Sequence, residues 1–239
     1  MKKGKLYLIP TSITGEGLKD TLRKKDLDII CTLDTYVVET AKVARRHLSG
    51  LELNKPIQQI EMIEVNEHTK NRDLDFILEP VFKGKDIGLM SDAGAPSIAD
   101  PGWRVILYAQ GHGIEIVPMI GPSSIFLALM ASGLNGQRFV FHGYLSKEQG
   151  KRIGDLKKLE QDSFRNDQTQ IFMEAPYKNE HLFEDILNSC DDNTYLCIAK
   201  DVLGEEGFVV TKKIEDWKKE KVILNKVPTL FLIYKDRFK

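Results

Sequence analysis

Long apolar runs are missing from this 239-residue chain. A membrane-spanning helix needs about 18 or more consecutive apolar residues, and no segment reaches that length. The apolar run after the basic N-terminus, residues 6–9, is too short for the core of a signal peptide. We therefore expect a cytoplasmic protein that does not associate with a membrane.

Cysteine is scarce as well. The three cysteines, Cys31, Cys190 and Cys197, show no CxxC spacing and no even count. Cys31 and Cys197 lie within apolar runs typical of strands, which predicts buried thiols. The five histidines are scattered without a pair at metal-ligand spacing, so no metal site is expected.

The chain has no surplus of positive charge. Its 34 lysines and arginines face 35 aspartates and glutamates, which gives a net charge of −1. Proteins that bind nucleic acid mainly through phosphates usually carry a positive surplus. Two local basic runs occur at residues 42–46 and 151–152, and both are predicted to be solvated helix faces.

The first half of the chain alternates short apolar runs with helical patterns. Strands separated by helices of this length predict right-handed βαβ crossovers and a mainly parallel sheet. The expected strands are residues 5–9, 28–32, 57–65, 86–91 and 114–119. The expected helices are residues 17–25, 37–47, 70–82 and 103–110.

A break at Gly121-Pro122 separates this half from the next. Two expected strands near Tyr195 and Phe208 have no helix between them, which indicates a mixed sheet with an antiparallel pair. We therefore predict two α/β domains, residues 1–119 and 120–239. The other expected elements of the second are helices at residues 123–132, 147–164 and 179–188, and strands at 139–144, 169–173, 195–200, 208–212 and 229–234.

The most informative loop reads SDAGAPSIADPG, residues 91–102. It follows an expected strand of a parallel sheet, where ligands bind at the carboxyl edge. Its small residues permit close backbone approach to a ligand, and its prolines reduce the entropy cost of holding one shape. A plain turn into the helix at Trp103 would not need twelve such residues, so a ligand-binding loop is the favoured interpretation.

Other loops carry weaker signals. Ser123 follows the Gly-Pro break, where it can cap a helix and expose N–H groups to a ligand. The loop from Pro10 to Thr14 matches neither a GxGxxG nor a phosphate-binding pattern. Glu174 follows an expected strand, and a solvated acid at a helix start is as plausible for it as a functional role.

With these loops the sequence resembles the tetrapyrrole (corrin and porphyrin) methylase family, whose members depend on S-adenosylmethionine. The similarity is greatest to the branch that methylates a ribose 2′-hydroxyl of small-subunit ribosomal RNA. It rests on SDAGAPSIADPG at 91–102, GPSS at 121–124, LALMASGL at 127–134, RFVFHGYL at 138–145 and MEAPYK at 173–178. These segments occur in the family's order along almost the whole chain.

The resemblance implies a homodimer in which S-adenosylmethionine lies in a cleft between two α/β domains. Residues implied for cofactor binding are Pro10 and Asp92, together with Gly94, Ala95 and Pro96 at the methionine end and Ser123 and Ser124 beside them. Residues implied for the adenosine are Phe172, Met173, Val202, Pro228 and Thr229.

The chain departs from the rRNA branch in loops on the acceptor side. Thr-Pro-Ile-Gly-Asn becomes PTSIT at 10–14, Glu-Asp-Thr-Arg becomes LDTY at 33–36, and Glu-Ala-Pro-His-Arg becomes EAPYK at 174–178. Lysine in place of arginine loses bidentate phosphate contacts. The acceptor therefore stays open between rRNA and a tetrapyrrole-like small molecule, with a non-catalytic protein of the same fold as a third reading.

A ribose hydroxyl needs a base to remove its proton, whereas a conjugated ring carbon needs less help. Asp34 and Glu174 are weak candidates for this base. Asp92 and Asp100 are favoured as bonding N–H groups of their own loop, and His68 as lying exposed on a polar helix face. The remaining acidic candidate is Glu67.

Overall fold

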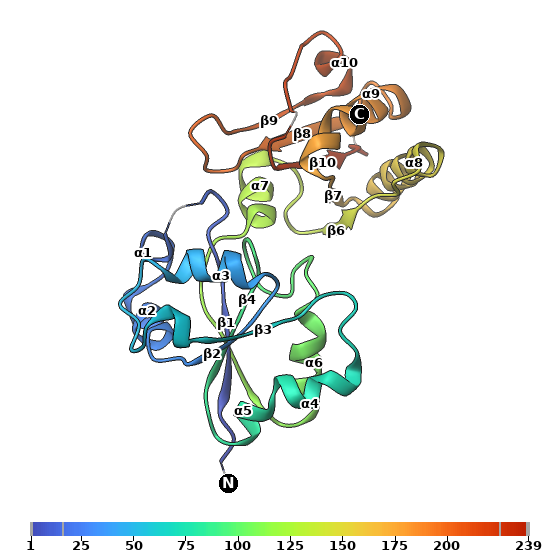
Figure 1. Cartoon of the computed structure of the whole chain (residues 1–239). Helices are drawn as coiled ribbons and strands as arrows, with labels where there is room; N and C mark the ends of the chain where they lie inside the picture. Colours follow the sequence, from blue (N-terminus) through green and yellow to red (C-terminus); the bar gives the residue numbers. More distant parts are fainter. Residues whose placement is uncertain (1, 16, 225, 238–239) are drawn as a thin grey trace. The chain divides into compact units, whose positions relative to one another are not determined.

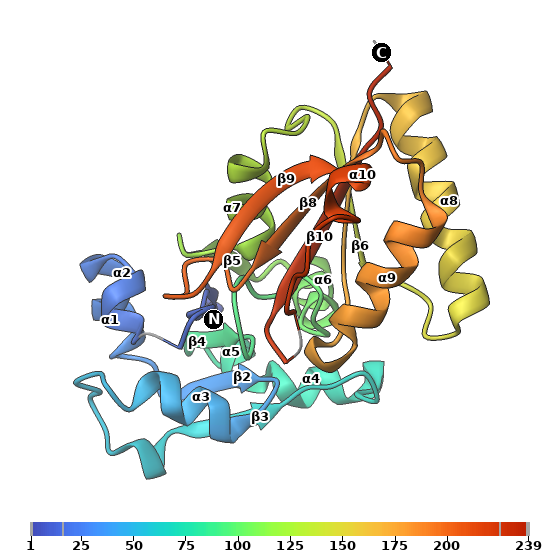
Figure 2. The same cartoon turned by 90° about the horizontal axis from the view of Figure 1, so that it is seen from above.

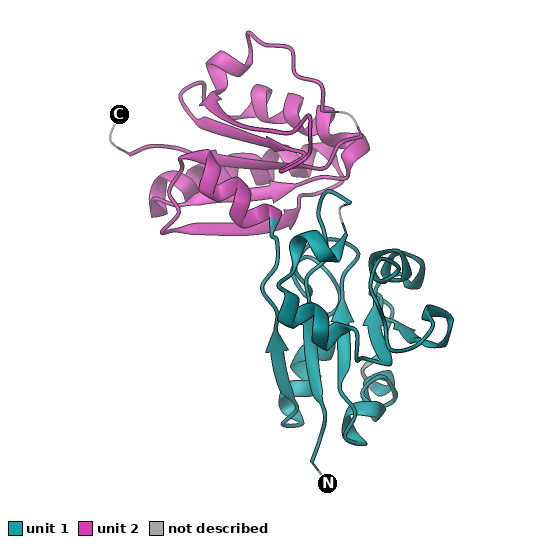
Figure 3. Cartoon of the chain, turned by 90° about the vertical axis from the view of Figure 1, so that its left-hand side faces the viewer, with its two compact units in different colours: residues 1–123 teal, residues 124–239 magenta. Residues whose placement is uncertain are grey.

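The computed structural model describes residues 2–15, 17–224 and 226–237. The chain divides into two compact units, Met1–Ser123 and Ser124–Lys239, coloured separately in Figure 3. The division falls just after the Gly121-Pro122 break. Each unit contains its own five-stranded sheet.

The first sheet is entirely parallel, with strand order β3-β2-β4-β1-β5. Its strands are short and mostly apolar, and β2 and β4 are buried along their whole length. Such continuous burial is typical of parallel strands covered on both faces. The strands are β1 Lys5–Ile9, β2 Thr35–Val38, β3 Glu61–Glu64, β4 Ile87–Met90 and β5 Glu115–Pro118.

Helices cover both faces of this sheet (Figure 1). One core joins Tyr7, Ile9 and Tyr36 to helices on the α1–α3 side, and another joins Leu6 and Val37 to helices on the α4–α6 side. Neighbouring strand residues alternate between these cores because side chains alternate across a strand. The helices are α1 Leu18–Thr21, α2 Lys24–Ile30, α3 Ala41–Leu48, α4 Leu74–Ile77, α5 Glu79–Phe82 and α6 Trp103–Gly111, with 3-10 turns η1 Ile57–Gln59 and η2 Asn71–Asp73.

The prediction of a strand at residues 28–32 is wrong, because helix α2 occupies most of that segment. The second strand is Thr35–Val38, which the sequence analysis had divided between a loop and a helix. Short apolar runs cannot be assigned to helix or strand from periodicity alone. Tertiary contacts decide here: Tyr36 is fully buried and donates a hydrogen bond from its hydroxyl to the Ile30 carbonyl at 2.7 Å.

The second sheet is mixed, with strand order β6-β7-β10-β8-β9. β6 and β7 are parallel, whereas β10 is antiparallel to both β7 and β8. The expected antiparallel pair is confirmed, because β8 and β9 pair from Tyr195 opposite Lys213 to Lys200 opposite Phe208. The strands are β6 Phe139–Tyr144, β7 Thr169–Met173, β8 Tyr195–Lys200, β9 Phe208–Lys213 and β10 Thr229–Tyr234.

Helix α7 covers one face of the second sheet, and α8 and α9 cover the other (Figure 2). The larger core lies on the α8–α9 side and includes Phe172, Phe231 and Trp217. The α7 side is smaller and packs around Leu129, Ile171 and similar residues. The helices are α7 Ser124–Ser132, α8 Gln149–Asn166, α9 Asn179–Ser189 and α10 Ile214–Trp217, with the 3-10 turn η3 Pro176–Lys178.

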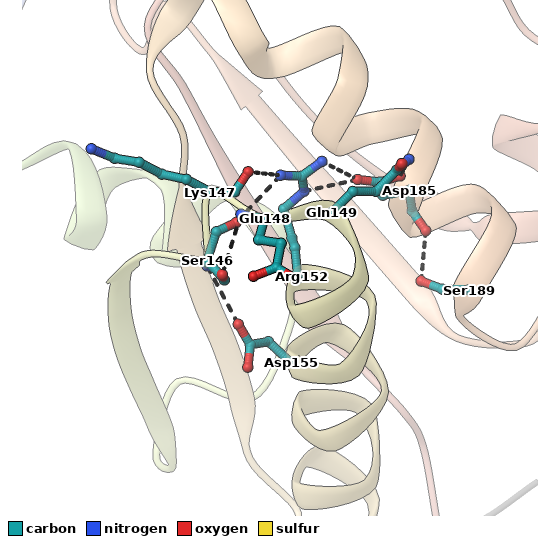
Figure 4. Close-up of polar contacts among 8 residues, drawn as sticks. All are labelled: Ser146, Lys147, Glu148, Gln149, Arg152, Asp155, Asp185 and Ser189. Carbon is teal, nitrogen blue, oxygen red and sulfur yellow. Dashed lines mark hydrogen bonds and ion pairs between the residues drawn. The ribbon is translucent and has the colours of Figure 1, made fainter.

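Arg152 is buried, so the expectation of a solvated basic run at 151–152 is wrong for this residue. Its guanidinium donates to Asp185 Oδ2 at 2.5 and 2.8 Å, and it also reaches the carbonyls of Ser146 and Lys147 (Figure 4). Gln149 Nε2 donates to the other oxygen of Asp185 at 2.9 Å. This network ties α8 to α9 and to the loop after β6.

Candidate functional site

The loops after β1 and β4 lie next to each other, because the two strands are parallel neighbours. After β1 the chain crosses to β2, on one side of this pair of strands. After β4 it crosses to β5, on the other side of the pair. Ligands of open α/β sheets bind outside the carboxyl ends of the strands at such a reversal. The loop 91–102 singled out in the sequence begins at this point.

A small bridge joins the two loops. Thr11 and Gly94 exchange backbone hydrogen bonds of 2.9 and 3.3 Å, and the Thr11 hydroxyl lies 3.3 Å from the Ser91 carbonyl. Gly94 has φ +77°, a conformation that residues with a side chain rarely adopt. The nearest atom to a Cβ placed there would be Ile13 Cγ2 at 3.5 Å, so Gly94 presents bare backbone on that side.

Asp100 holds the rest of the loop. Its carboxylate accepts hydrogen bonds from the N–H groups of Ser97 and Gly102, both at 2.6 Å. The expectation that Asp100 bonds N–H groups of its own loop is therefore confirmed. These bonds stabilise Ser97 and Ala99 at φ +68° and +62°. Such conformations cost about 1–3 kcal/mol each and cluster at ligand sites.

Asp92 makes a different set of contacts. Its carboxylate accepts from the Thr40 hydroxyl at 2.8 Å and from the Thr40 N–H at 3.2 Å, so it bonds the loop after β2 and not its own loop. The Asp92 N–H donates to Glu39 Oε2 at 2.6 Å, and His47 Nε2 lies 3.0 Å from the Asp92 carbonyl. The side chains after β2 and in α3 thus fix where the 91–102 loop starts.

Burial changes the acidity of two carboxyls in this region. It raises the pKa of Glu39, an effect opposed by the hydrogen bond from the Asp92 N–H and reinforced by Asp100 and Asp92. It also raises the pKa of Asp100, although the N–H groups of Gly102 and Ser97 favour the charged form. A cluster of acids that share a partly buried edge favours a ligand with positive charge nearby.

The loop after β5 closes against the loop after β1. A Cβ on Gly121 would lie 2.3 Å from Pro10 Cβ, so only glycine permits this approach. Pro10 is buried beneath it. Ser123 and Ser124 follow, both half-buried, and α7 begins at Ser124.

Loops of the second unit form another group at one edge of the second sheet. Met173 ends β7 and pairs with Leu230, while Thr229 begins β10 and pairs with Lys200 at the end of β8. The Asp201 N–H donates to the Pro228 carbonyl at 2.8 Å. The residues predicted to face adenosine, Met173, Val202, Pro228 and Thr229, therefore belong to one edge of one sheet.

Left-handed backbone is also found in these loops. Asp201, Leu203 and Lys226 have φ of +45°, +74° and +62°. A Cβ on Gly204 would collide with the Asp201 carboxylate at 2.0 Å, and one on Gly207 would collide with the Asp201 carbonyl oxygen at 2.0 Å. The turn after β8 is thus tightly wound, and its strain points to a function, as in the 91–102 loop.

The ring of Phe172 corrects one expectation. It is fully buried in the core on the α8–α9 side, where it stacks with Phe231 at a centroid distance of 6.1 Å. Its side chain therefore cannot face adenosine. Met173 points to the opposite face because neighbours alternate along a strand, and like Val202 it packs against the core on the α7 side.

Glu174 and Asn179 lie just beyond β7. Glu174 is buried, and its carboxylate accepts a 2.7 Å hydrogen bond from the Ala175 N–H. Asn179 is completely buried at the start of α9 and donates to the Val227 carbonyl at 2.7 Å. Asn179, Glu39 and Thr40 were not predicted as site residues, because nothing in the local sequence marks a side chain that holds a distant loop.

Asp34 lies away from these groups of loops. It precedes β2 at the amino end of the strand and pairs with Lys55 at 2.5 Å in an exposed position. It had been placed after a strand at residues 28–32, which does not form. The exposed His68 pairs with Glu67 at 3.6 Å in a turn, so the expectation of a helical position for it is also wrong.

The described residues contain no group of three or more His, Cys, Asp or Glu side chains arranged to hold a metal ion. None of the helices they form has the length and apolarity needed to cross a membrane.

The sequence model for tetrapyrrole (corrin/porphyrin) methylases matches residues 17–216. Two similar relatives are each named ribosomal RNA small subunit methyltransferase I. The protein of Buchnera aphidicola is 29% identical over 92% of this chain and 74% of its own length. The protein of Escherichia coli O157:H7 is 28% identical over 84% of this chain and 66% of its own length.

Solved structures share the fold at low identity. The methyltransferase CobJ has a TM-score of 0.60 and 17% identity, over 97% of this chain and 94% of its own. Uroporphyrin III C-methyl transferase from Thermus thermophilus has a TM-score of 0.58 and 15% identity, over 97% of this chain and 98% of its own. These matches confirm the expected fold of one parallel and one mixed α/β sheet.

Proposed function

Because this chain belongs to the tetrapyrrole (corrin/porphyrin) methylase family, we propose that it transfers a methyl group from S-adenosylmethionine to ribosomal RNA of the small subunit. The methyltransferase class and the donor follow from the family. The acceptor is suggested by relatives named for that rRNA. The chain spans 66–74% of the length of those two relatives, so its own activity and acceptor are part of the proposal.

The proposal rests on the loop at the carboxyl edge of the first sheet, whose backbone is fixed by hydrogen bonds. Gly94, Ala95 and Pro96 are held between the Thr11 bridge and the Asp100 hydrogen bonds. In our proposal this backbone holds the methionine end of the donor, together with Pro10, Asp92, Ser123 and Ser124. Met173, Val202, Pro228 and Thr229 contact the adenosine.

Methyl transfer from a sulfonium is an in-line displacement with an activated donor. The protein mainly aligns the nucleophile, methyl group and sulfur, which can lower the barrier by about 7–11 kcal/mol. Loops fixed by hydrogen bonds to Asp92 and Asp100 suit that task because they lose little freedom on binding. Glu39 then acts as a positioning residue through Asp92.

Exposed cations near this edge support an RNA acceptor. Lys42, Arg45 and Arg46 lie on α3, which follows the Glu39–Thr40 loop directly, and none is paired with a carboxylate of the described residues. In the second unit, Lys178 follows Glu174 and its amine lies 5.5 Å from the Tyr177 ring centroid. Free cations beside a site supply the phosphate contacts that dominate binding to nucleic acid.

The deciding experiment offers tritium-labelled S-adenosylmethionine with isolated small ribosomal subunits and, separately, with tetrapyrrole precursors. Label in rRNA that is resistant to alkaline cleavage at one ribose supports the proposal. Label in the tetrapyrrole alone identifies a small-molecule methylase. Donor binding by calorimetry without label in either acceptor would contradict the proposed acceptor, and no donor binding would contradict the donor site.

The proposal includes a cytoplasmic homodimer, in line with the family resemblance. Light scattering after gel filtration tests the oligomeric state of the 27.2 kDa chain. A mass near twice that value is expected at micromolar concentration. A monomer that still methylates rRNA would remove the dimer from the proposal.

A further inference from the structure

Asn179 is the first residue of α9, and its side chain is completely buried. An asparagine near a helix start usually caps the helix by accepting a hydrogen bond from a backbone N–H at its side-chain oxygen. The Oδ1 atom of Asn179 accepts no hydrogen bond from the part of the chain that the structure describes. Helix capping therefore does not explain why a polar side chain occupies this buried position.

The amide nitrogen of Asn179 has its partners outside the helix. Nδ2 donates to the Val227 carbonyl at 2.7 Å and to the Leu224 carbonyl at 3.5 Å. Both partners are acceptors, so the nitrogen end of the amide must face them, and the oxygen end is left without a donor. A buried acceptor without a donor lowers stability, and such a violation is expected where a residue serves function.

The Asn179 amide holds the segment that leads into β10. The Val227 carbonyl also accepts a hydrogen bond from the Thr229 hydroxyl at 3.0 Å, so both of its lone pairs are used. Pro228 has no N–H to donate, and its carbonyl accepts from the Asp201 N–H at 2.8 Å. The backbone of Val227, Pro228 and Thr229 is thus fixed from one side by the loop after β8 and from the other by Asn179.

A second bond joins the same two segments. The Lys226 N–H donates to the Pro176 carbonyl at 3.0 Å, and Lys226 has a left-handed backbone with φ +62°. Such a conformation is costly for a residue with a side chain and persists only where the surrounding structure holds it. The turn after β7 and the segment before β10 are therefore connected at Pro176 and again at Asn179.

We propose that Asn179 is a positioning residue for the adenosine half of the methyl donor. This role rests on the proposed function, in which Pro228 and Thr229 contact the adenosine. Pro228 is exposed to a ligand, whereas Asn179 is completely buried, so the amide acts only through the backbone that it holds. The proposed contacts with the methionine half come from other loops. Loss of the amide should therefore weaken binding of the adenosine alone.

The test compares two ligands by isothermal titration calorimetry of the full-length protein: S-adenosylmethionine, and 5′-methylthioadenosine, which lacks the amino-acid part. Asn179→Asp keeps the shape of the side chain, but its ionised carboxylate has no hydrogen to donate to the Val227 carbonyl. The affinity for both ligands should fall by the same factor, about tenfold or more. Without ligand, the amide hydrogens of Lys226 and Asp201 should exchange faster in this variant than in the wild type.

Leu196→Ala is the control for a general loss of stability. Leu196 is fully buried in the core of the same unit, at the second position of β8, whereas Asp201 follows the last position of that strand. Its truncation leaves a cavity in the core and should leave both affinities unchanged at temperatures where the variant is folded. Asn179→Ala replaces Asn179→Asp if the latter does not melt cooperatively, because it removes the donor without adding a charge.

Three outcomes would contradict the proposal, and they can be told apart. Wild-type affinity for 5′-methylthioadenosine in the Asn179 variants would overturn the role of Asn179 and leave the proposed function standing. An equal loss of affinity in Leu196→Ala would show that the effect is one of general stability and would overturn the role as well. A wild-type protein that binds neither ligand would contradict the proposed donor site itself, and the role of Asn179 with it.

Discussion

Thr11 and Gly94 exchange hydrogen bonds through both backbone N–H groups, which couples the loops after β1 and β4. This contact requires φ +77° at Gly94. Gly94→Ala should therefore reduce the affinity for S-adenosylmethionine by more than about tenfold, since about 1.4 kcal/mol is enough for that factor. Isothermal titration calorimetry measures the change.

Gly113→Ala is the matched control for this variant. Gly113 also has positive φ, +64°, and nothing lies within 4 Å of an added Cβ. Both variants should lose about 1 kcal/mol of stability for the backbone conformation alone. Equal donor affinity in the two variants would remove the Gly94 loop from the proposed donor site.

The raised pKa of Glu39 links this site to pH. The folded state holds the proton more tightly than the unfolded state, so the stability contributed by this group is present at low pH and lost as pH rises through the folded pKa. Glu39→Gln can still accept the Asp92 N–H and should flatten this loss in the pH interval above the ordinary glutamate pKa of 4.5. Thermal melts of both proteins across that interval measure the difference.

The same linkage applies to Asp100, whose pKa is also raised by burial. The melts therefore compare Glu39→Gln with the wild type, because both proteins keep the Asp100 carboxyl. A variant whose stability changes with pH in parallel with the wild type would show that Glu39 titrates normally.

The buried pair of Arg152 and Asp185 should dominate the stability of the second unit. Arg152→Met leaves the Asp185 carboxylate buried without its partner and should cost about 3–5 kcal/mol in urea unfolding. Lys151→Met removes the adjacent exposed cation, which pairs with Glu148 on the surface, and should cost less than about 1 kcal/mol. Similar losses would mean that the guanidinium network is not what stabilises α8 against α9.

RNA binding should depend steeply on salt, because each phosphate contact releases counterions. Arg45→Ala with Arg46→Ala, and separately Lys178→Ala, should lower the log–log salt slope by about 1 per lost contact. Lys24→Ala with Lys25→Ala removes two exposed cations from α2 as the control. Filter binding to a small-subunit rRNA fragment gives the slopes, and an unchanged slope in the first two proteins would exclude these cations from the RNA contact.

The sequence by itself determined the family, the methyl donor and the two-sheet α/β class, because these depend on motifs that can be read in order along the chain. SDAGAPSIADPG, the loop after β4, indicated the family, and the match over residues 17–216 confirms that family. The charge pattern did not distinguish an rRNA acceptor from a small molecule, because solvated cations and cations that bind a ligand have the same appearance in sequence. The roles of the individual site residues stay predictions.

Only the tertiary structure decided which side chains meet. The Thr11 hydroxyl approaches the Gly94 carbonyl across 83 positions, and Arg152 reaches Asp185 across 33. Local periodicity carries no information about such contacts, and it predicted a strand at residues 28–32, most of which belong to helix α2. Because β2 was predicted too early in the chain, Glu39 was not recognised as a residue that follows a strand. Phe172 faces the core for a different reason: side chains alternate along a strand, so Phe172 and Met173 lie on opposite faces of the sheet.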